Sequence, residues 1–157
     1  MIPHIKLALY DFDGVMTDNT ALMDERGSEY VKVNRSDGLA VKLISELGID
    51  QIIVSTEANP IVSKRAEKLK ISCFQDVTDK TKAVKEITCK NGVKLEETVF
   101  IGNDINDLGA MNLCGYALCP KDARDEIKAI CHKILPSLGG HGVIRDFYDF
   151  LKKEQKF

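Results

Sequence analysis

The sequence lacks tryptophan and has no apolar run close to the length that crosses a membrane. A helix that spans a bilayer needs about 20 predominantly apolar residues. The first residues, 1–6, also lack the basic start and the long apolar stretch of a secretory signal peptide. We therefore expect no membrane partner, and we expect the chain to act in the cytoplasm.

Two further absences narrow the function. The formal net charge is −2 and the basic residues are scattered, so no basic stripe would neutralise nucleic-acid phosphates, and we expect no nucleic-acid partner. The number of cysteines is odd and none of them form a Cys-x-x-Cys pair, which argues against a disulfide framework and against a zinc site. We expect reduced, mostly buried thiols at Cys73, Cys89, Cys114, Cys119 and Cys131.

What the sequence does contain is an alternation of strand-like and helix-like segments over 157 residues, the length of one ordinary domain. This βαβα order predicts an α/β fold: a doubly wound, Rossmann-like parallel sheet with helices on both faces. We expect a single domain over residues 1–157, with a β-hairpin at about 19–33 and a C-terminal tail at about 137–157. The expected strands are 5–10, 51–54, 72–74, 98–101 and 116–119, and the expected helices are 36–47 (capped by Ser36), 60–69, one after Asp79, 105–113, 122–130 and 143–153.

A pair of acidic residues follows the first expected strand. Asp11 and Asp13 are separated by one residue, and Gly14 then allows the chain to turn sharply. Asp and Gly are also common in plain polar turns, so this pair alone does not identify a site. A calcium-binding loop is excluded, because such a loop needs glycine at its sixth position and Met16 stands there.

Three more polar positions follow later strands. Ser55 comes after the second expected strand, Lys80 begins a helix, and the segment Gly-Asn-Asp-Ile-Asn-Asp at 102–107 follows the strand at 98–101. Each has an ordinary explanation, since most lysines are solvated and an acidic segment can simply cap a helix. Their order is more informative, because the carboxyl ends of parallel strands meet at one edge of a sheet. We therefore expect these positions to converge on the acid pair.

This order of motifs resembles the haloacid-dehalogenase-like phosphohydrolase superfamily. The resemblance implies that Asp11 attacks phosphorus and forms an aspartyl-phosphate, and that Asp13 protonates the leaving group and then activates water. It also implies that Ser55 donates a hydrogen bond to the phosphoryl group and that Lys80 balances its charge. The implied cofactor is Mg²⁺, and the candidate metal-binding residues are Asp11, Asp13, Asn103, Asp104 and Asp107.

Longer segments make the resemblance narrower and extend it over nearly the whole chain. Residues 11–18, 33–38, 65–69, 79–80 and 139–146 are similar to the capless phosphatases of 3-deoxy-ulosonic acid phosphates. That family includes 3-deoxy-D-manno-octulosonate 8-phosphate phosphatase and the 9-phosphate phosphatases of sialic-acid-type sugars, and its module also occurs fused to cytidylyltransferases. The resemblance implies a small phosphorylated sugar acid as substrate. It also implies a homotetramer formed through the hairpin, in which the glycine-rich tail or a neighbouring subunit closes the site.

The same resemblance implies a set of substrate-binding residues. The octulosonate enzymes usually carry Thr-Gly-Arg where this chain has Ser55-Thr56-Glu57, and Glu57 with Lys68 looks more like the nine-carbon sugar branch. Lys68 could pair with the substrate carboxylate, and Glu57 could accept hydrogen bonds from sugar hydroxyls or an amine. Charged residues on an amphipathic helix are more often just its solvated face. The candidates are Asn34, Ser36, Glu57, Arg65, Lys68 and Arg145.

One position departs from the family pattern. The fourth motif normally has an aspartate metal ligand where this chain has Asn103, whose amide oxygen can bind Mg²⁺ but brings no negative charge. An active phosphatase, first for a nonulosonate 9-phosphate and next for the octulosonate 8-phosphate, is favoured by the intact Asp11 and Asp13. A catalytically weak or inactive oligomerisation module that works with a CMP-sialic acid synthetase is favoured by Asn103 and the altered second motif. A promiscuous phosphatase or a phosphotransferase is a third hypothesis.

Overall fold

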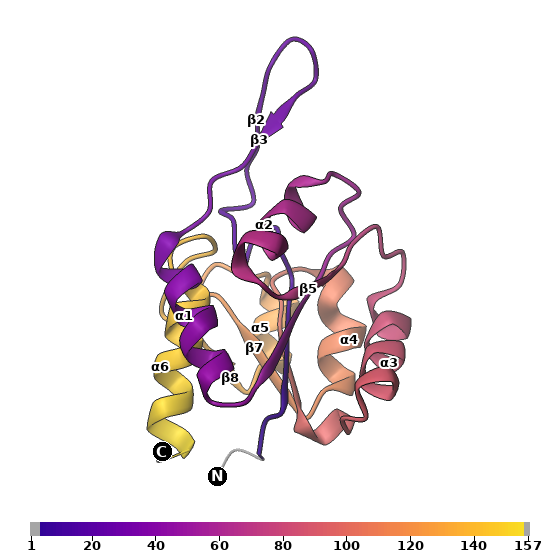
Figure 1. The fold of residues 1–157 in the computed structure, drawn as a ribbon, viewed down its shortest axis with the longest axis vertical. Coiled ribbons are helices and arrows are strands. Elements are labelled where there is room, and N and C mark those ends of the chain that lie inside the picture. The colour runs from indigo at the N-terminus through magenta and orange to yellow at the C-terminus, as the bar shows by residue number, and fades with distance from the viewer. Residues whose placement is uncertain (1–3, 156–157) are drawn as a thin grey trace.

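The structure, a computed structural model, describes residues 4–155 and consists of three layers, with helices on both faces of a central sheet (Figure 1). The sheet has six strands in the order β5-β4-β1-β6-β7-β8, and every neighbouring pair is parallel. The predicted doubly wound α/β fold is confirmed. The strands are β1 Leu7–Tyr10, β4 Asp50–Val54, β5 Ser72–Phe74, β6 Thr98–Ile101, β7 Tyr116–Cys119 and β8 Lys133–Ile134.

Two apolar cores lie on opposite faces of the sheet, because successive side chains of a strand point to opposite sides. Ala8 and Tyr10 belong to the core on one face, whereas Leu7 and Leu9 belong to the core on the other. Burial on both faces explains why β1 reads as one continuous apolar run. The core of Ala8 and Tyr10 is covered by α1 Arg35–Glu46, α2 Ile61–Leu69 and α6 Val143–Gln155. The core of Leu7 and Leu9 is covered by α3 Lys80–Asn91, α4 Leu108–Leu113 and α5 Asp125–Ile130.

Several expected element ends were wrong. Asn34, not Ser36, caps α1, because the Asn34 side chain accepts a hydrogen bond from the backbone N–H of Ser36 at 2.8 Å. Asp122 does not begin a helix; its carboxylate accepts a hydrogen bond from the backbone N–H of Gly139 at 2.9 Å, and α5 begins later. The segment expected as one helix at 105–113 is a 3-10 turn, Ile105–Asp107, followed by α4.

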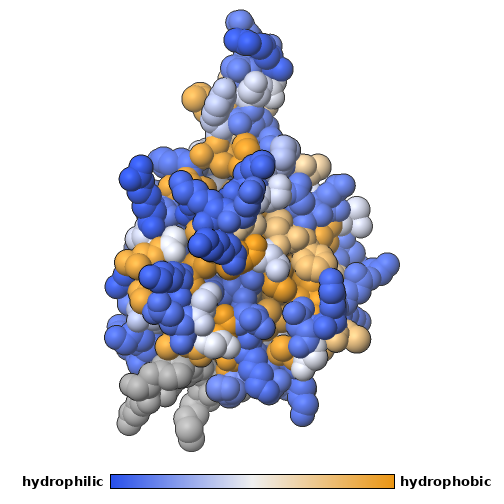
Figure 2. Space-filling model, in the orientation of Figure 1, coloured by the Kyte–Doolittle hydropathy of each residue, from blue (hydrophilic) through white to orange (hydrophobic). Residues whose placement is uncertain are grey.

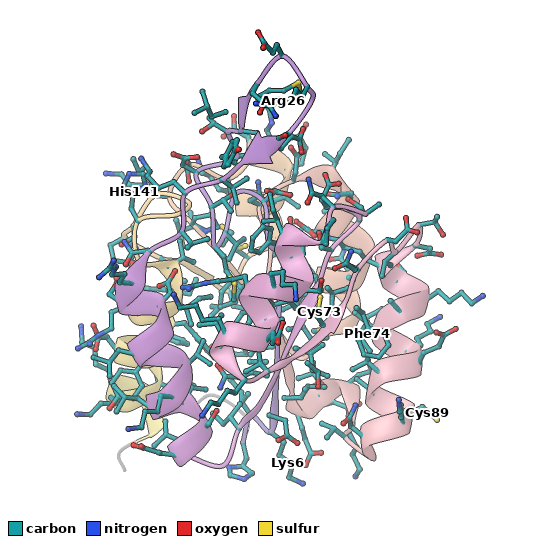
Figure 3. All side chains as sticks on the ribbon, turned by 45° about the horizontal axis from the view of Figure 1, so that its top comes forward. Lys6, Arg26, Cys73, Phe74, Cys89 and His141 are labelled. Atoms are coloured by element: carbon teal, nitrogen blue, oxygen red, sulfur yellow. The ribbon has the colours of Figure 1, made fainter. Side chains whose placement is uncertain are left out.

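The structure differs from the sequence-based expectations in two further respects. Strand β8 was not predicted, since it is only two exposed residues long and shows no apolar run. All five thiols are free, as expected, but only two are buried: Cys114 and Cys119 are buried, Cys73 and Cys131 are partly exposed, and Cys89 is exposed. In Figure 3 the Cys89 side chain points out of its helix, away from the core.

The expected hairpin is present and projects beyond the carboxyl edge of the sheet, with Arg26 at its tip (Figures 1 and 3). Its strands are short, β2 Leu22–Met23 and β3 Glu29–Tyr30, and they pair antiparallel. Three large apolar side chains on it are left open to solvent: Leu22 is 74% exposed, Met23 62% and Tyr30 59%. Figure 2 shows hydrophobic atoms along the hairpin below a hydrophilic tip. Within residues 4–155, every helix is too short or too polar to cross a bilayer.

Helix α1 holds the start of α6 through one buried carboxylate. Asp37 Oδ1 accepts hydrogen bonds from the backbone N–H groups of Ile144 and Arg145, both at 3.1 Å. Burial raises the pKa of Asp37 to about 6, even though these hydrogen bonds and Arg65 oppose the rise. The Asp37 carboxylate on α1 therefore caps the N-terminus of α6, although its burial makes its ionisation unfavourable.

The raised pKa of Asp37 predicts a pH-dependent stability. Because the folded pKa of about 6 lies above the ordinary value of 3.8, the contribution of Asp37 to folding stability is fully present below pH 3.8 and is lost as pH rises through 6. The shift corresponds to about 3 kcal/mol. Asp37→Asn keeps an acceptor oxygen but cannot titrate, so its free energy of unfolding should change less than the wild-type value between pH 4 and pH 6. Urea unfolding at several pH values tests this, with the exposed Asp50→Asn as control; parallel wild-type and Asp37→Asn curves would contradict it.

Candidate active site

The polar motifs meet where the strand order reverses. From β1 the chain moves to β4 and β5 on one side and then returns to β6 on the other, and such a reversal leaves a crevice beyond the carboxyl ends of the strands. Asp11 directly follows β1 and donates its backbone N–H to the carbonyl of Ile101 in β6 at 2.9 Å. The crevice is a cavity of about 400 Å³ lined by Asp11, Asp13, Asn19, Ser55, Thr56, Asn103, Asp104, Ile105 and Asn106.

Asp11 is buried, and one of its carboxylate oxygens is fully engaged. Oδ1 accepts the backbone N–H of Phe12 at 2.7 Å and lies 2.7 Å from Lys80 Nζ. Burial and the nearby charge of Asp107 raise the pKa of Asp11, and Lys80 opposes that rise. The second oxygen, Oδ2, is left for groups at the cavity, which is the arrangement that a carboxylate nucleophile needs.

Lys80 is held between two buried carboxylates. Its Nζ lies 2.7 Å from Asp11 Oδ1 and 2.6 Å from Asp107 Oδ1, over the ring of Phe100. Burial lowers the pKa of Lys80, but the two carboxylates outweigh this and leave the pKa raised, so the ammonium group stays charged. The helix that Lys80 begins is capped by Asp79, as expected.

Asp107, one of the candidate metal-binding residues, contacts Lys80 and the loop at 102–104. It is fully buried, and its second oxygen accepts the backbone N–H groups of Asn103 and Asp104 at 2.9 and 3.2 Å. A Cβ on Gly102 would lie 2.7 Å from the Asp107 carboxylate, so this close approach requires glycine there. With both oxygens occupied, Asp107 positions Lys80 and the 102–104 loop and does not face the cavity.

Asn103 brings its amide to the two acids. One terminal atom of that amide lies 2.9 Å from Asp11 Oδ2 and 2.9 Å from the backbone carbonyl oxygen of Asp13. Gly14, with φ +86°, makes room, because a Cβ there would overlap the Asn103 side chain. If the terminal atom is nitrogen, it donates to both oxygens; if it is oxygen, three oxygens face one another and need a cation between them.

Asp13 stands at the edge of the cavity and is partly exposed. Its Oδ1 accepts a hydrogen bond from the Thr17 hydroxyl at 3.2 Å. Burial raises the pKa of Asp13; the Thr17 hydrogen bond opposes the rise, and the charges of Glu57 and Glu29 add to it. A raised pKa favours the protonated carboxyl, the form that a general acid needs.

Ser55 follows β4 and is buried beside Asp11 and Asp13 in the wall of the cavity. Its backbone N–H donates to the carbonyl of Phe74 at 2.9 Å, which ties the loop to β5. Its Oγ accepts the backbone N–H of Glu57 at 3.1 Å. The hydroxyl proton remains able to donate to an anion in the cavity.

The structure separates the remaining candidates. Asp104 lines the cavity, but its oxygens face the backbone N–H of Ile105 at 2.7 Å and Arg124 Nε at 3.7 Å, so its carboxylate is occupied locally. Glu57 lines a neighbouring cavity of about 200 Å³ together with Asp13. Sequence reasoning missed Glu29 and Asn59 in that same cavity. Glu29 was missed because a pattern of residue types does not reveal the register of a short hairpin, and Asn59 because an Asn just before a helix is explained by capping alone.

The other expected substrate contacts do not reach Asp11 within one chain. Arg65 and Lys68 line a separate cavity of about 760 Å³ between α1 and α2. Asn34 caps α1 by accepting the backbone N–H of Ser36 at 2.8 Å, and Arg145 Nε lies 3.5 Å from Asp149 on its own helix. These five side chains therefore lie outside both cavities that Asp13 lines.

The glycine-rich tail packs against the loop that follows β1. Gly140 donates its backbone N–H to the carbonyl of Val15 at 3.0 Å, and a Cβ on Gly139 would lie 2.3 Å from the Gly14 carbonyl oxygen. His141 lies at the side of the molecule in Figure 3 and contacts the Gly139 carbonyl at 2.7 Å. Among tail residues 137–155, none lines either cavity beside Asp13, and 156–157 lie outside the described residues.

Asp11, Asp13, Ser55 and Lys80 thus meet at one edge of the sheet, in the order that the resemblance to haloacid-dehalogenase-like phosphohydrolases implied. A family model described as haloacid dehalogenase-like hydrolase matches residues 7–146. The chain therefore belongs to the haloacid dehalogenase-like hydrolase family and is an enzyme of that class.

Among curated proteins, 3-deoxy-D-manno-octulosonate 8-phosphate phosphatase KdsC of Haemophilus influenzae is 30% identical over 155 residues, which cover 98% of this chain and 86% of the relative. N-acylneuraminate cytidylyltransferase A of Danio rerio is 26% identical over 161 residues, covering 97% of this chain. The chain spans 36% of that longer protein.

Solved structures agree with the sequence relatives. The 3-deoxy-D-manno-octulosonate 8-phosphate phosphatase of Moraxella catarrhalis, in complex with magnesium ion, phosphate ion and KDO, superposes with a TM-score of 0.92 and is 28% identical, covering 96% of this chain and 87% of that one. The cobalt-bound phosphatase of Haemophilus influenzae superposes with a TM-score of 0.93 and is 30% identical, covering 98% and 90%.

Proposed function

We propose that this chain is a Mg²⁺-dependent phosphatase that hydrolyses the phosphate monoester of a 3-deoxy-ulosonic acid sugar through an aspartyl-phosphate. The observation that carries the proposal is the arrangement around Asp11. Lys80 fixes one of its oxygens, and the other stands at the cavity beside the Asp13 carbonyl and the Asn103 amide.

The side chains of the cavity divide the reaction between them. Asp11 Oδ2 attacks phosphorus, the bond from phosphorus to the sugar oxygen breaks, and Asp13 gives its proton to the leaving oxygen. Asp13 then takes a proton from the water that attacks the aspartyl-phosphate, which releases phosphate and restores Asp11. Ser55 donates its hydroxyl proton to a phosphoryl oxygen, and Lys80 offsets negative charge on Asp11 and on the phosphoryl group.

The residues present fit a divalent cation. Within residues 4–155 no three His, Cys, Asp or Glu side chains form a metal-binding group, so the donors would be mixed. They would be Asp11 Oδ2, the Asp13 carbonyl oxygen and, in the orientation that turns its amide oxygen toward these two atoms, Asn103. Hard oxygen donors of this kind suit Mg²⁺, with water completing its shell. The ion would reduce the repulsion between a dianionic phosphate ester and the Asp11 carboxylate.

Asn103→Asp tests whether position 103 binds the metal. Without Mg²⁺ the new carboxylate would face Asp11 and the Asp13 carbonyl with no proton to donate, so we expect a lower melting temperature in EDTA than for the wild type. With Mg²⁺ the added charge should tighten binding by about tenfold. Calorimetric Mg²⁺ titration and thermal melts measure both effects, with Asn106→Asp at the cavity wall as control. An unchanged Mg²⁺ affinity would refute the assignment of Asn103 as a ligand.

Two observations bear on which sugar phosphate is the substrate, and they favour different sugars. Glu57 beside Asp13 favours a nonulosonate 9-phosphate, whereas the phosphatase relatives are named for the octulosonate 8-phosphate. A weakly active or inactive module that accompanies a cytidylyltransferase is the second candidate, favoured by Asn103 and by the similarity to the Danio rerio protein. Phosphate release from both sugar phosphates, with and without Mg²⁺, separates these functions. Release from neither sugar phosphate would favour the module.

We also propose that the chain works as a homotetramer joined through the hairpin. An isolated two-stranded hairpin is marginally stable in water, and the exposed Leu22, Met23 and Tyr30 give it an apolar surface to bury. In such an assembly Arg65 and Lys68 would contact a substrate only across a subunit boundary, because their cavity is separate from that of Asp11. A monomeric mass in light scattering would contradict the tetramer.

The cytoplasmic location of the chain stays a prediction.

A further inference from the structure

The cavity of about 200 Å³ beside Asp13 is acidic at its rim and apolar at its floor. Asp13, Glu29 and Glu57 contribute three carboxyl groups, and no Lys, Arg or His is among its lining residues. The buried side chains of Phe12 and Val62 form part of the floor. Because Asp13 also lines the cavity that holds Asp11, a phosphate at Asp11 would direct its ester group toward this second cavity.

Asn59 fixes both glutamates. Its side-chain amide donates to Glu29 Oε2 at 3.3 Å, and its backbone N–H donates to Glu57 Oε1 at 2.9 Å. Its Oδ1 accepts the backbone N–H of Ile61, the first residue of α2, at 3.0 Å. One oxygen of each glutamate is thereby held, and the other remains able to accept a hydrogen bond from a ligand.

We propose that Glu29, which the hairpin carries, is a specificity-determining residue. Together with Glu57 it forms a pocket that receives the hydroxyl-bearing or cationic part of the leaving group and excludes a carboxylate. The inference rests on the proposed function in placing the phosphate beside Asp11. The inference also places the carboxylate of a sugar acid outside this pocket. The reason is that carboxylate groups without a compensating cation repel one another.

Because Glu29 lies on the hairpin, the hairpin also helps to form the pocket. Glu29 lies in β3, whereas Glu57 lies in the loop after β4, so the pocket is complete only when the hairpin stands against the start of α2. A contact that merely docked the hairpin would not need two glutamates with open oxygens facing one cavity. The position of the hairpin is therefore coupled to recognition of the leaving group.

The test compares two small phosphate esters that differ at one end. Glycerol 3-phosphate presents a hydroxymethyl group where 3-phosphoglycerate presents a carboxylate. Binding is measured by chemical-shift titration of the full chain with Mg²⁺, in an Asp11→Asn background that prevents turnover. We expect the glycerol ester to bind about tenfold more tightly, and Glu29→Gln or Glu57→Gln to reduce this ratio by about threefold or more.

Glu25→Gln at the exposed hairpin tip is the matched control, and it should leave the ratio unchanged. Equal binding of the two esters, or an unchanged ratio in Glu29→Gln, overturns the proposal. The same holds if Glu29→Gln weakens both esters equally, since that result assigns Glu29 to hairpin docking alone. Phosphate release by the wild-type chain is measured separately: a binding preference without turnover would refute the phosphatase and leave the pocket standing.

Discussion

Asp11→Asn is expected to abolish Mg²⁺-dependent phosphate release, with kcat falling by at least about 1000-fold. The amide that replaces the carboxylate is a poor nucleophile and carries no charge for a divalent cation. Its oxygen can still accept the backbone N–H of Phe12 and a hydrogen bond from Lys80, so the fold should survive. Steady-state phosphate release and circular dichroism measure the two properties side by side.

Asp18→Asn is the matched control for this variant. Asp18 belongs to the same motif, but its carboxylate faces Lys32 at 3.4 Å and the Thr20 hydroxyl at 2.6 Å, and it lies outside the cavity. We expect it to keep near wild-type kcat. Undiminished turnover in a well-folded Asp11→Asn protein would mean that another group attacks phosphorus, and the proposed mechanism would be lost.

The sequence predicted the convergence of the site because topology alone produces it. Asp11, Ser55 and Asn103 each follow a parallel strand, and the carboxyl ends of such strands lie together whatever the loops do. Burial of β1 and β6 on both faces made those strands easy to recognise as apolar runs. Lys80 could be predicted because a cation is unfavourable at a helix N-terminus, which indicates that the residue has another use.

Other parts of the site depend on contacts that no residue pattern encodes. The structure turns Asp107 away from the cavity, because two backbone N–H groups and Lys80 already occupy its oxygens. Arg65 lies on α2, and its Nη2 donates to the Asn34 carbonyl at 3.0 Å, so its side chain is held outside the cavity of Asp11. Glu29 lines the pocket only because the hairpin contacts Asn59, whose side-chain amide donates to the Glu29 carboxylate. Each depends on side-chain direction and on long-range packing, which periodicity does not determine.

Lys80→Met should lower both activity and stability. The side chain keeps its length but loses its charge, which leaves Asp11 and Asp107 buried without their shared cation. Breaking a buried ion pair on one side costs about 3 to 5 kcal/mol of folding free energy. Loss of a charge stabiliser at the reacting centre costs about 3 to 4 kcal/mol in the transition state, so kcat should fall by about 100- to 1000-fold. Urea unfolding and phosphate release measure the two losses.

A second substitution separates the two roles of Lys80. The double variant carries Lys80→Met together with Asp107→Asn. Position 107 then has no unpaired charge, while the amide oxygen of the new side chain can still accept the backbone N–H of Asn103. Part of the lost stability should therefore return. Activity should stay low, because Asp11 and the phosphoryl group still lack a cation. If the double variant recovered turnover together with stability, Lys80 would be a structural residue only, and the charge balance proposed for the phosphoryl group would have to come from elsewhere in the cavity.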